Sequence, residues 1–112
     1  MSGYSLFIDD ERFPPRNDGR EWVIARDMED VMMWLRINGM PNYISFDHDL
    51  GAGIPTGYDI AKLLVELDMG GDSNFALPAN FDFYVHSQNP IGKRNIEYYL
   101  RNYLAHRRNS GM

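Results

Sequence analysis

Short apolar segments alternate along this chain with segments whose apolar residues recur at helical spacing, and this alternation constrains the fold most strongly. Four short runs are typical of buried strands: residues 4–8, 22–25, 43–46 and 81–85. The segments after the second, third and fourth runs repeat apolar side chains at i, i+3, i+4 and i+7, the pattern of one helix face. Because alternating strands and helices form a mainly parallel sheet with helices on its faces, we predict a small α/β domain.

Polar residues mark the start of each predicted helix. Asp27 is a good N-cap for the first helix. Thr56 and Asp59 have the spacing of a capping box for the second helix, and Asn89 is a good N-cap for the third. Prolines and turn residues instead predict a loop between the first two strands, and glycines predict a loop between the second helix and the last strand. We expect residues 109–112 to fray.

Length and composition fit a single domain that covers residues 1–112. A chain of 112 residues with 44% hydrophobic content is enough for one continuous core. The absence of cysteine excludes disulfides, thiolate zinc sites and a cysteine nucleophile. A net charge of −5 argues against bulk binding of duplex nucleic acid. No apolar run approaches the roughly 20 residues that cross a membrane, so we expect a cytoplasmic protein without a membrane partner.

Three of the four predicted strands end in polar side chains that are capable of chemistry. The groups are Asp9-Asp10-Glu11-Arg12 after the first strand, Asp47-His48-Asp49 after the third and His86-Ser87-Gln88-Asn89 after the fourth. In parallel sheets, ligands bind outside the carboxyl ends of the strands. We therefore expect the three groups to converge on one site.

The aspartates of these groups predict a metal site. Carboxylates that lie close together repel one another unless they are protonated or neutralised. A hard divalent cation, Mg²⁺ or Mn²⁺, held by one or two carboxylates with water and a phosphate, is the ordinary solution. The candidate ligands are Asp9, Asp10, Asp47 and Asp49. The alternative is that single aspartates only cap neighbouring loops.

His48 and His86 are candidates for proton transfer, because imidazole titrates near neutral pH. Two histidines that flank a phosphodiester can act as base and acid. The alternative for each histidine is a structural, hydrogen-bonded role.

The start of the last predicted helix indicates a phosphate site. The backbone N–H groups of its first turn and its positive dipole end would face the shared cleft. Side chains that can add hydrogen bonds or positive charge are Arg12, Ser87, Asn89, Lys93 and Arg94. The guanidinium of Arg12 can donate two parallel hydrogen bonds to phosphate oxygens. The alternative is that Asn89 only caps the helix and that the basic residues form a solvated helix face.

Four phrases in this order resemble the cyclic-phosphate processing receiver domains, a divergent branch of the response-regulator receivers. They are Leu6-Phe7-Ile8-Asp9-Asp10-Glu11-Arg12, Ser45-Phe46-Asp47-His48-Asp49-Leu50-Gly51, Gly57-Tyr58-Asp59-Ile60-Ala61 and Val85-His86-Ser87-Gln88-Asn89-Pro90. The resemblance implies a three-layer, flavodoxin-like sheet of about four mainly parallel strands in the order 2-1-3-4. A loop would replace the first helix.

The resemblance also implies a function. It is that of a metal-dependent phosphoesterase that opens a cyclic phosphate, at an RNA 2′,3′-cyclic end or in a related nucleotide. In that enzyme Asp47 would be a metal ligand or the nucleophile. His86 would act as the acid that protonates the leaving oxygen, and His48 or a metal-bound water would supply the nucleophile. Receivers also have a fifth strand with a lysine, which this chain lacks, and this disfavours an ordinary phosphoryl switch. The alternative is a non-enzymatic module that binds a phosphate-bearing ligand or a protein; the substrate and the oligomeric state stay open.

Overall fold

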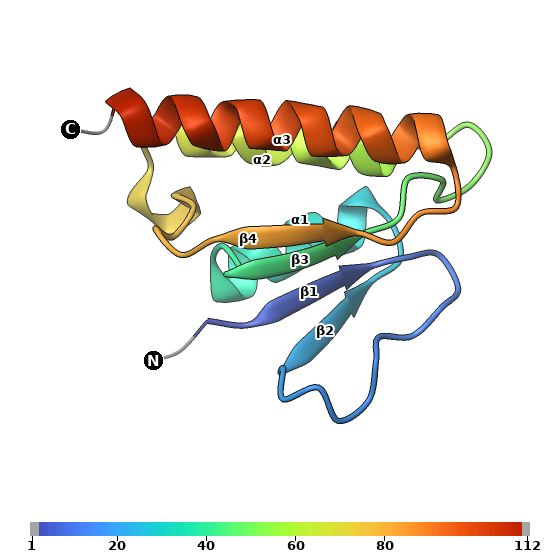
Figure 1. Cartoon of the computed structure of the whole chain (residues 1–112). Coiled ribbons are helices and arrows are strands. Elements are labelled where there is room, and N and C mark those ends of the chain that lie inside the picture. The colour runs from blue at the N-terminus through green and yellow to red at the C-terminus, as the bar shows by residue number, and fades with distance from the viewer. Residues whose placement is uncertain (1–2, 111–112) are drawn as a thin grey trace.

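The four predicted strands pair into one parallel sheet. A computed structural model describes residues 3–110 of the chain. Its strands are β1 (Ser5–Ile8), β2 (Trp22–Ala25), β3 (Tyr43–Phe46) and β4 (Asp82–Val85), in the order β2-β1-β3-β4 (Figure 1). Every neighbouring pair is parallel. The predicted receiver-like α/β fold and its strand order are therefore confirmed.

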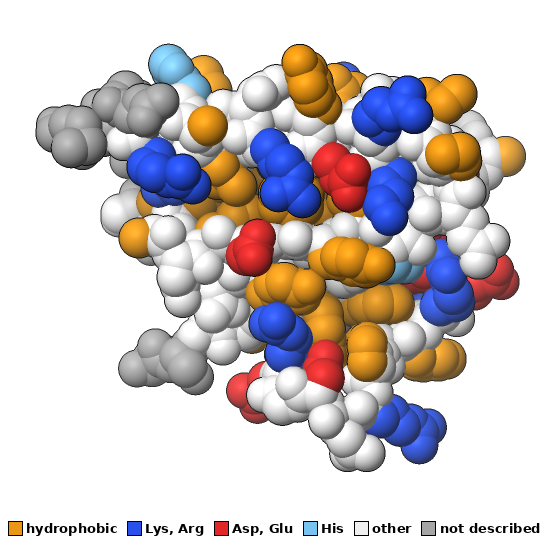
Figure 2. All heavy atoms as spheres, in the orientation of Figure 1, with side chains coloured by type: hydrophobic (Ala, Val, Ile, Leu, Met, Phe, Trp, Pro, Cys, Tyr) orange, Lys and Arg blue, Asp and Glu red, His pale blue; other side chains and the backbone are white. Residues whose placement is uncertain are grey.

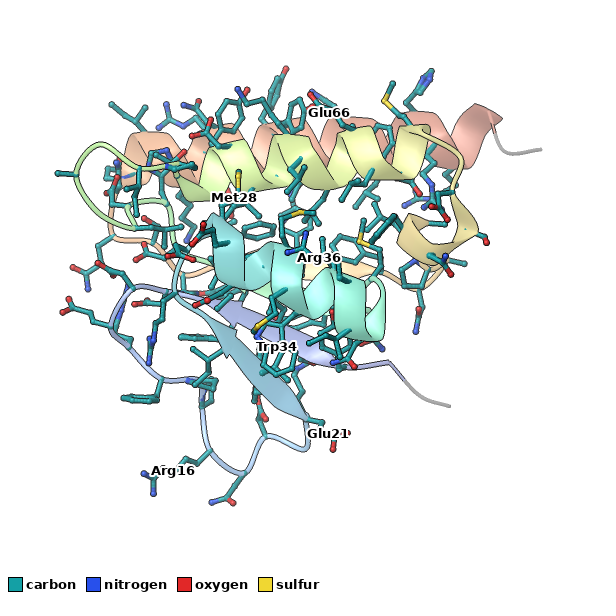
Figure 3. All side chains as sticks on the ribbon, turned by 180° about the vertical axis from the view of Figure 1, so that it is seen from behind. Arg16, Glu21, Met28, Trp34, Arg36 and Glu66 are labelled. Atoms are coloured by element: carbon teal, nitrogen blue, oxygen red, sulfur yellow. The ribbon has the colours of Figure 1, made fainter. Side chains whose placement is uncertain are left out.

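Three α-helices connect or follow these strands: α1 (Met28–Asn38), α2 (Gly57–Met69) and α3 (Pro90–Ser110). The chain runs from β2 through α1 to β3 and from β3 through α2 to β4, so both crossovers proceed the same way across the sheet. Because such crossovers are right-handed, they place both helices on one face. Figure 1 shows α1 behind the sheet, and α2 behind α3 along the β4 edge; Figure 3 shows α1 and α2 from behind.

No helix within residues 3–110 covers the opposite face of the sheet, which is turned toward the viewer in Figure 1. Tyr84 on this face is 53% exposed. The connection from β1 to β2, residues 9–21, is a loop as predicted. Because this connection runs the other way across the sheet, it is the one that would carry a helix onto the open face. The third layer of the expected arrangement is therefore not seen in the described part of the chain.

The covered face of the sheet carries the hydrophobic core. Its strand side chains are almost fully buried: Leu6, Ile8, Ala25, Ile44, Phe46 and Val85. They form one cluster with buried helix side chains, Val31, Leu35, Ile60, Leu64, Ile96 and Leu100. Burial of each Leu, Ile, Val or Phe side chain stabilises the fold by about 1.5–3 kcal/mol. Trp34 of α1, labelled in Figure 3, also donates a hydrogen bond from Nε1 to the Ile24 carbonyl oxygen at 3.0 Å.

The predicted helix starts are confirmed by side-chain hydrogen bonds at each cap. Asp27 caps α1, Thr56 forms a capping box with Asp59 at the start of α2, and Asn89 caps α3. These caps satisfy backbone N–H groups that have no partner inside the helix. At its other end, α3 includes residues 109 and 110, where we expected fraying, and residues 111 and 112 lie outside the described part of the chain.

The buried carboxylate of Asp68 ties the C-terminal half of α3 to the end of α2. One of its oxygens accepts hydrogen bonds from the Tyr103 hydroxyl at 2.5 Å and from Arg107 Nε at 2.9 Å. The other accepts from the Leu77 N–H at 2.8 Å. Burial and the adjacent Asp68 carboxylate raise the pKa of Tyr103 to about 12. The connection to β4, which contains a short 3₁₀ helix at Ser73–Phe75, is thereby held against both helices.

Gly57 lets the first turn of α2 lie directly against the loop after β3. A Cβ atom added there would lie 2.0 Å from the carbonyl oxygen of Asp47. The Gly57 N–H also donates to the His48 carbonyl oxygen at 2.8 Å. We predict that Gly57→Ala lowers the free energy of unfolding by about 1–3 kcal/mol, because the helix or the loop must shift. Urea denaturation measures this change.

The matched control is Gly70→Ala at the end of α2. Gly70 has right-handed helical angles, φ −68° and ψ −15°, and an added Cβ meets nothing closer than 3.4 Å. This variant should stay within about 1 kcal/mol of the wild type. Equal destabilisation by both substitutions would contradict the packing role of Gly57.

Candidate functional site

Hydrogen bonds continue the sheet one residue beyond its strands and align the polar residues that follow. The Asp47 N–H donates to the Ile8 carbonyl oxygen at 2.8 Å, and the His86 N–H donates to the Phe46 carbonyl oxygen at 2.9 Å. Asp9, Asp47 and His86 consequently occupy equivalent positions after β1, β3 and β4. Because equivalent positions of neighbouring strands face the same side of a sheet, these side chains lie together.

A cleft of about 600 Å³ opens at this edge of the sheet. It is lined by Asp10, Glu11, Arg12, Asp47, Asp49, Ser87, Gln88, Asn89 and Pro90. All three strand-end groups contribute, so the structure brings together the groups that we expected to converge. The predicted site residues that do not line the cleft are Asp9, His48, His86, Lys93 and Arg94.

Asp9 is a fully buried carboxylate that four N–H donors surround. Its Oδ1 accepts from the backbone N–H groups of Glu11 and Arg12, at 2.9 and 2.8 Å. Its Oδ2 lies 2.9 Å from both Arg12 Nε and His86 Nε2. Burial opposes ionisation, but the hydrogen bonds and the Arg12 charge outweigh it, so the pKa of Asp9 lies below its ordinary value. Asp9 is therefore an anion at neutral pH. Its hydrogen bonds to the backbone of Glu11 and Arg12 fix the turn of the chain after β1.

Arg12 lies between the two aspartates that follow β1 and β3. Its Nη2 is 3.8 Å from Asp47 Oδ2, while its Nε is bound to Asp9. Arg26 holds the same segment by donating from Nη1 to the carbonyl oxygens of Asp9 and Arg12, at 2.9 and 2.7 Å. On the other side, Asp47 Oδ1 accepts from the His48 N–H at 2.8 Å. The half-exposed guanidinium of Arg12 thus presents positive charge to the cleft.

His86 connects Asp9 to the open face of the sheet. Its Nε2 is bound to Asp9, and its Nδ1 lies 2.7 Å from Ser45 Oγ. Because Asp9 is anionic, we assign the ring proton to Nε2, which leaves Nδ1 to accept from the Ser45 hydroxyl. The ring also stacks on Phe7, with centroids 4.6 Å apart. Both ring nitrogens of His86 therefore have protein partners.

Ser45 and Arg26 belong to the site but were not predicted from the sequence. Ser45 is a polar residue inside an apolar strand, two positions before Asp47. The period-two alternation of strands could have placed it on the same face as that aspartate. Arg26 directly follows β2, so the rule that ligands bind at strand ends could have included it.

His48 lies against the first turn of α3. A Cβ on Gly92 would be 2.3 Å from His48 Cγ, so only glycine leaves room for the ring. His48 Nδ1 is 2.8 Å from Asp49 Oδ1, and Asn89 Nδ2 donates to Asp49 Oδ2 at 3.2 Å. Hydrogen bonds from His48 and Asn89 hold the pKa of Asp49 below its ordinary value. This cluster joins the loop after β3 to the start of α3.

The N-terminal end of α3 forms one wall of the cleft. Pro90 lines it, and Ser87 Oγ accepts from the Asn89 N–H at 3.1 Å. The positive end of the helix dipole consequently favours an anion at this wall. The positive charge of Lys93 lies outside the cleft, because its Nζ lies over the Tyr84 ring, 5.7 Å from the centroid.

Asp9, Asp47 and His86 form a group that could hold a metal ion. One ligand atom from each lies within 4.8 Å of the others. Two carboxylates and an imidazole form a donor set that fits a divalent cation. Of the other predicted ligands, Asp10 and Asp49 line the cleft together with Asp47, and Asp49 has the partners described above.

The chain matches a known protein family. A family model described as the cyclic-phosphate processing receiver domain matches residues 4–102, a segment that includes every site residue named above. No curated protein and no solved structure matches the chain. No helix in the described part of the chain is both long and apolar enough to cross a membrane.

We predict that Asp9→Asn lowers the free energy of unfolding at neutral pH by about 3–5 kcal/mol, because an amide group would face the Arg12 and His86 donors in a buried position. The difference should shrink in acid. The carboxylate stabilises the fold above the ordinary aspartate pKa, and this contribution is lost as the pH falls through the lower pKa of the folded state. Urea denaturation in EDTA, from neutral pH to about pH 3, measures both effects.

Asp10→Asn is the matched control, because Asp10 is the exposed neighbour of Asp9. Its free energy of unfolding should stay within about 0.5 kcal/mol of the wild type across the same range. If the two variants were equally stable, the central structural role of Asp9 would be wrong.

Proposed function

The chain belongs to the cyclic-phosphate processing receiver domain family, and on this premise we propose that its cleft hydrolyses a cyclic phosphate ester. The observation that carries the proposal is the position of Arg12, between Asp9 and Asp47 and in one cleft with the start of α3. Binding of a phosphate requires positive charge and N–H donors, which Arg12 and the start of α3 supply. Binding of a metal ion requires carboxylates, which Asp9 and Asp47 supply. The proposed substrate is an RNA end with a 2′,3′-cyclic phosphate or a related nucleotide.

Arg12, Ser87 and the start of α3 would bind the phosphate. The guanidinium can donate two parallel hydrogen bonds to two phosphate oxygens, and the helix dipole favours the same negative charge. Asn89 already caps α3 and contacts Asp49, so we assign it a positioning role. Lys93 would act on the bound phosphate only through longer-range charge, as would Arg94.

A divalent cation, Mg²⁺ or Mn²⁺, would be held by Asp9 and Asp47, with Asp10 at the open side of the cleft. When bound, the cation supplies positive charge that stabilises the negative charge developing on the phosphate oxygens. Arg12 contacts both carboxylates. When the cation is bound, the guanidinium must therefore share these carboxylates with the cation or turn toward the phosphate. The carboxylate of Asp49 would support the site through its hydrogen bonds to the neighbouring loop and α3.

The proposed reaction adds one water molecule across one P–O bond of the ring. The water oxygen attacks phosphorus, the bond to O2′ or O3′ breaks, and the products are a phosphomonoester and a free hydroxyl on the same ribose. The water loses one proton and the leaving oxygen gains one.

We assign proton transfer to His86, which is bonded to Asp9, and a positioning role to His48, whose ring packs on Gly92. Attack by Asp47, followed by hydrolysis of the acyl phosphate, gives the same products.

A second candidate is a module that binds the cyclic phosphate without opening it. The observation that favours it is the set of hydrogen bonds that occupies both ring nitrogens of His86 and both oxygens of Asp9. In this case those two residues only hold the loop after β1, and Arg12 binds the phosphate.

We predict that the protein opens an oligonucleotide 2′,3′-cyclic phosphate in Mg²⁺ or Mn²⁺ and that EDTA stops the reaction. Asp47→Asn should slow ring opening by about 100-fold or more, because it removes a carboxylate that holds the cation or attacks phosphorus. The matched control is Glu66→Gln on α2, outside the cleft (Figure 3), which should leave the rate unchanged. Phosphorus NMR of the RNA end follows the reaction. Ring opening that persisted in Asp47→Asn would exclude this cleft as the active site.

His86→Gln separates catalysis from binding. Proton transfer requires the imidazole, whereas phosphate binding requires only that the loop after β1 stays in place. We predict that ring opening falls by about 100-fold or more while the affinity for the cyclic phosphate changes by less than about threefold. Titration calorimetry in EDTA, in which no ring is opened, measures the affinity of both proteins. An unchanged rate of ring opening would assign His86 a purely positioning role.

A further inference from the structure

The open face of the sheet carries an array of aromatic side chains. Phe7 of β1 and Tyr84 of β4 are in register with Ser45 between them, and Trp22 and Tyr43 lie two residues farther from the strand ends on the same face. Figure 2, in the orientation of Figure 1, shows hydrophobic side chains gathered over this face. Tyr84 is exposed, Trp22 and Tyr43 are half-buried and Phe7 is buried. A partly exposed aromatic surface beside a charged cleft is typical of a ligand site rather than of a solvated face.

These side chains surround a hollow of about 350 Å³, which falls in the range of small-molecule sites, about 300–1,000 Å³. Arg12 lines both this hollow and the cleft at the strand ends, so the two lie side by side. His86 also lines the hollow, while its Nε2 is bound to Asp9 beside the cleft. A single ligand can therefore occupy both.

We propose that this hollow is a nucleoside subsite, which receives the base and ribose of the nucleotide whose cyclic phosphate lies in the cleft. The inference rests on the proposed function, because it places the phosphate at Arg12. In a 2′,3′-cyclic phosphate the ribose is fused directly to the phosphate ring, so the base lies one sugar away from phosphorus. One step of two residues back along a strand covers about 6.6 Å, and it leads from Asp47 and His86 to Ser45 and Tyr84.

The chemistry of the hollow fits a base better than a purely apolar ligand. Bases stack on aromatic rings regardless of sequence, and the half-exposed Tyr84 ring offers such a surface. The Arg20 guanidinium lies 3.6 Å from the centre of the Tyr43 ring, at the end of the hollow away from the cleft. Arg20 thus adds a second positive charge to the hollow, which favours a negatively charged nucleotide over a neutral apolar ligand. The Ser45 hydroxyl, buried beside His86, supplies a polar group within the hollow.

The test compares two ligands that share the five-membered cyclic phosphate but differ in the base: adenosine 2′,3′-cyclic phosphate and glycerol 1,2-cyclic phosphate. Titration calorimetry in EDTA, in which no ring is opened, measures binding to the wild type and to Tyr84→Ala. We expect Tyr84→Ala to bind the adenosine ligand about tenfold more weakly and the glycerol ligand with unchanged affinity. Tyr84→Phe, which keeps the ring, should bind both ligands as the wild type does.

The matched control is Tyr98→Ala on α3, because Tyr98 is also a highly exposed aromatic residue, 71% against 53% for Tyr84, but does not line the hollow. This variant should bind both ligands normally. Equal affinity of wild type and Tyr84→Ala for the adenosine ligand would overturn the subsite. A loss of equal size for both ligands would overturn it too, because the ring would then act on the phosphate and not on the base.

Failure of the subsite is distinguishable from failure of the proposed function. If the wild type opens both ligands and Tyr84→Ala behaves as the wild type, only the subsite is wrong. If nothing is opened but the adenosine ligand binds in a Tyr84-dependent way, the subsite stands and hydrolysis is wrong. If neither ligand binds, both the subsite and the proposed function are wrong.

Sedimentation tests whether a second copy of the protein covers the open face instead of a nucleotide. If the wild type is a dimer that Tyr84→Ala dissociates and Tyr98→Ala does not, this face is an interface between two copies and the subsite is overturned.

Discussion

The buried carboxylate of Asp9 connects more parts of the cleft than any other group. A charge in this position is tolerated only when hydrogen bonds replace its water, and here four N–H donors do so. Two of the donors are backbone groups, so the chain must turn immediately after β1. The third aims the Arg12 guanidinium at Asp47, and the fourth orients the His86 ring. The buried carboxylate of Asp9 thus determines the turn of the chain after β1, the position of the Arg12 guanidinium and the orientation of the His86 ring.

That turn also explains why the sheet has one open face. The chain leaves β1 toward β2 as a loop, residues 9–21, while the other two crossovers carry helices to the opposite side. On the open face Tyr84 is exposed, Trp22 and Tyr43 are half-buried and Phe7 is buried, and Arg12 lies where this face meets the cleft. The same local event therefore creates the charged site and places a loop, not a helix, beside the adjoining aromatic surface. Phosphate and base recognition would then be properties of two adjacent parts of one surface.

The secondary structure was predictable to within one residue at most ends, because the signals are local. Thr56 and Asp59 are three residues apart and cap a helix by contacting each other's backbone, whatever the rest of the chain does. The third layer was expected from a family resemblance, whereas a local signal, the prolines and turn residues between the first two strands, predicts a loop in the one connection that would carry a helix onto the open face. The role of His48 had no local signal, because its ring is seated on Gly92, a contact between two segments that are far apart in the sequence.

The sequence by itself determined that three strands of a parallel sheet end in charged or polar residues, and parallel strands must present those ends at one edge. Only the tertiary structure decided which of these residues bind one another. His86 is bound to Asp9 across 77 positions and to Ser45 across 41, and Arg12 reaches Asp47 from the neighbouring strand end. Such pairings depend on strand register and on the direction of each side chain in the packed fold. Neither follows from local pattern, because both are set by the closure of distant segments onto a common core.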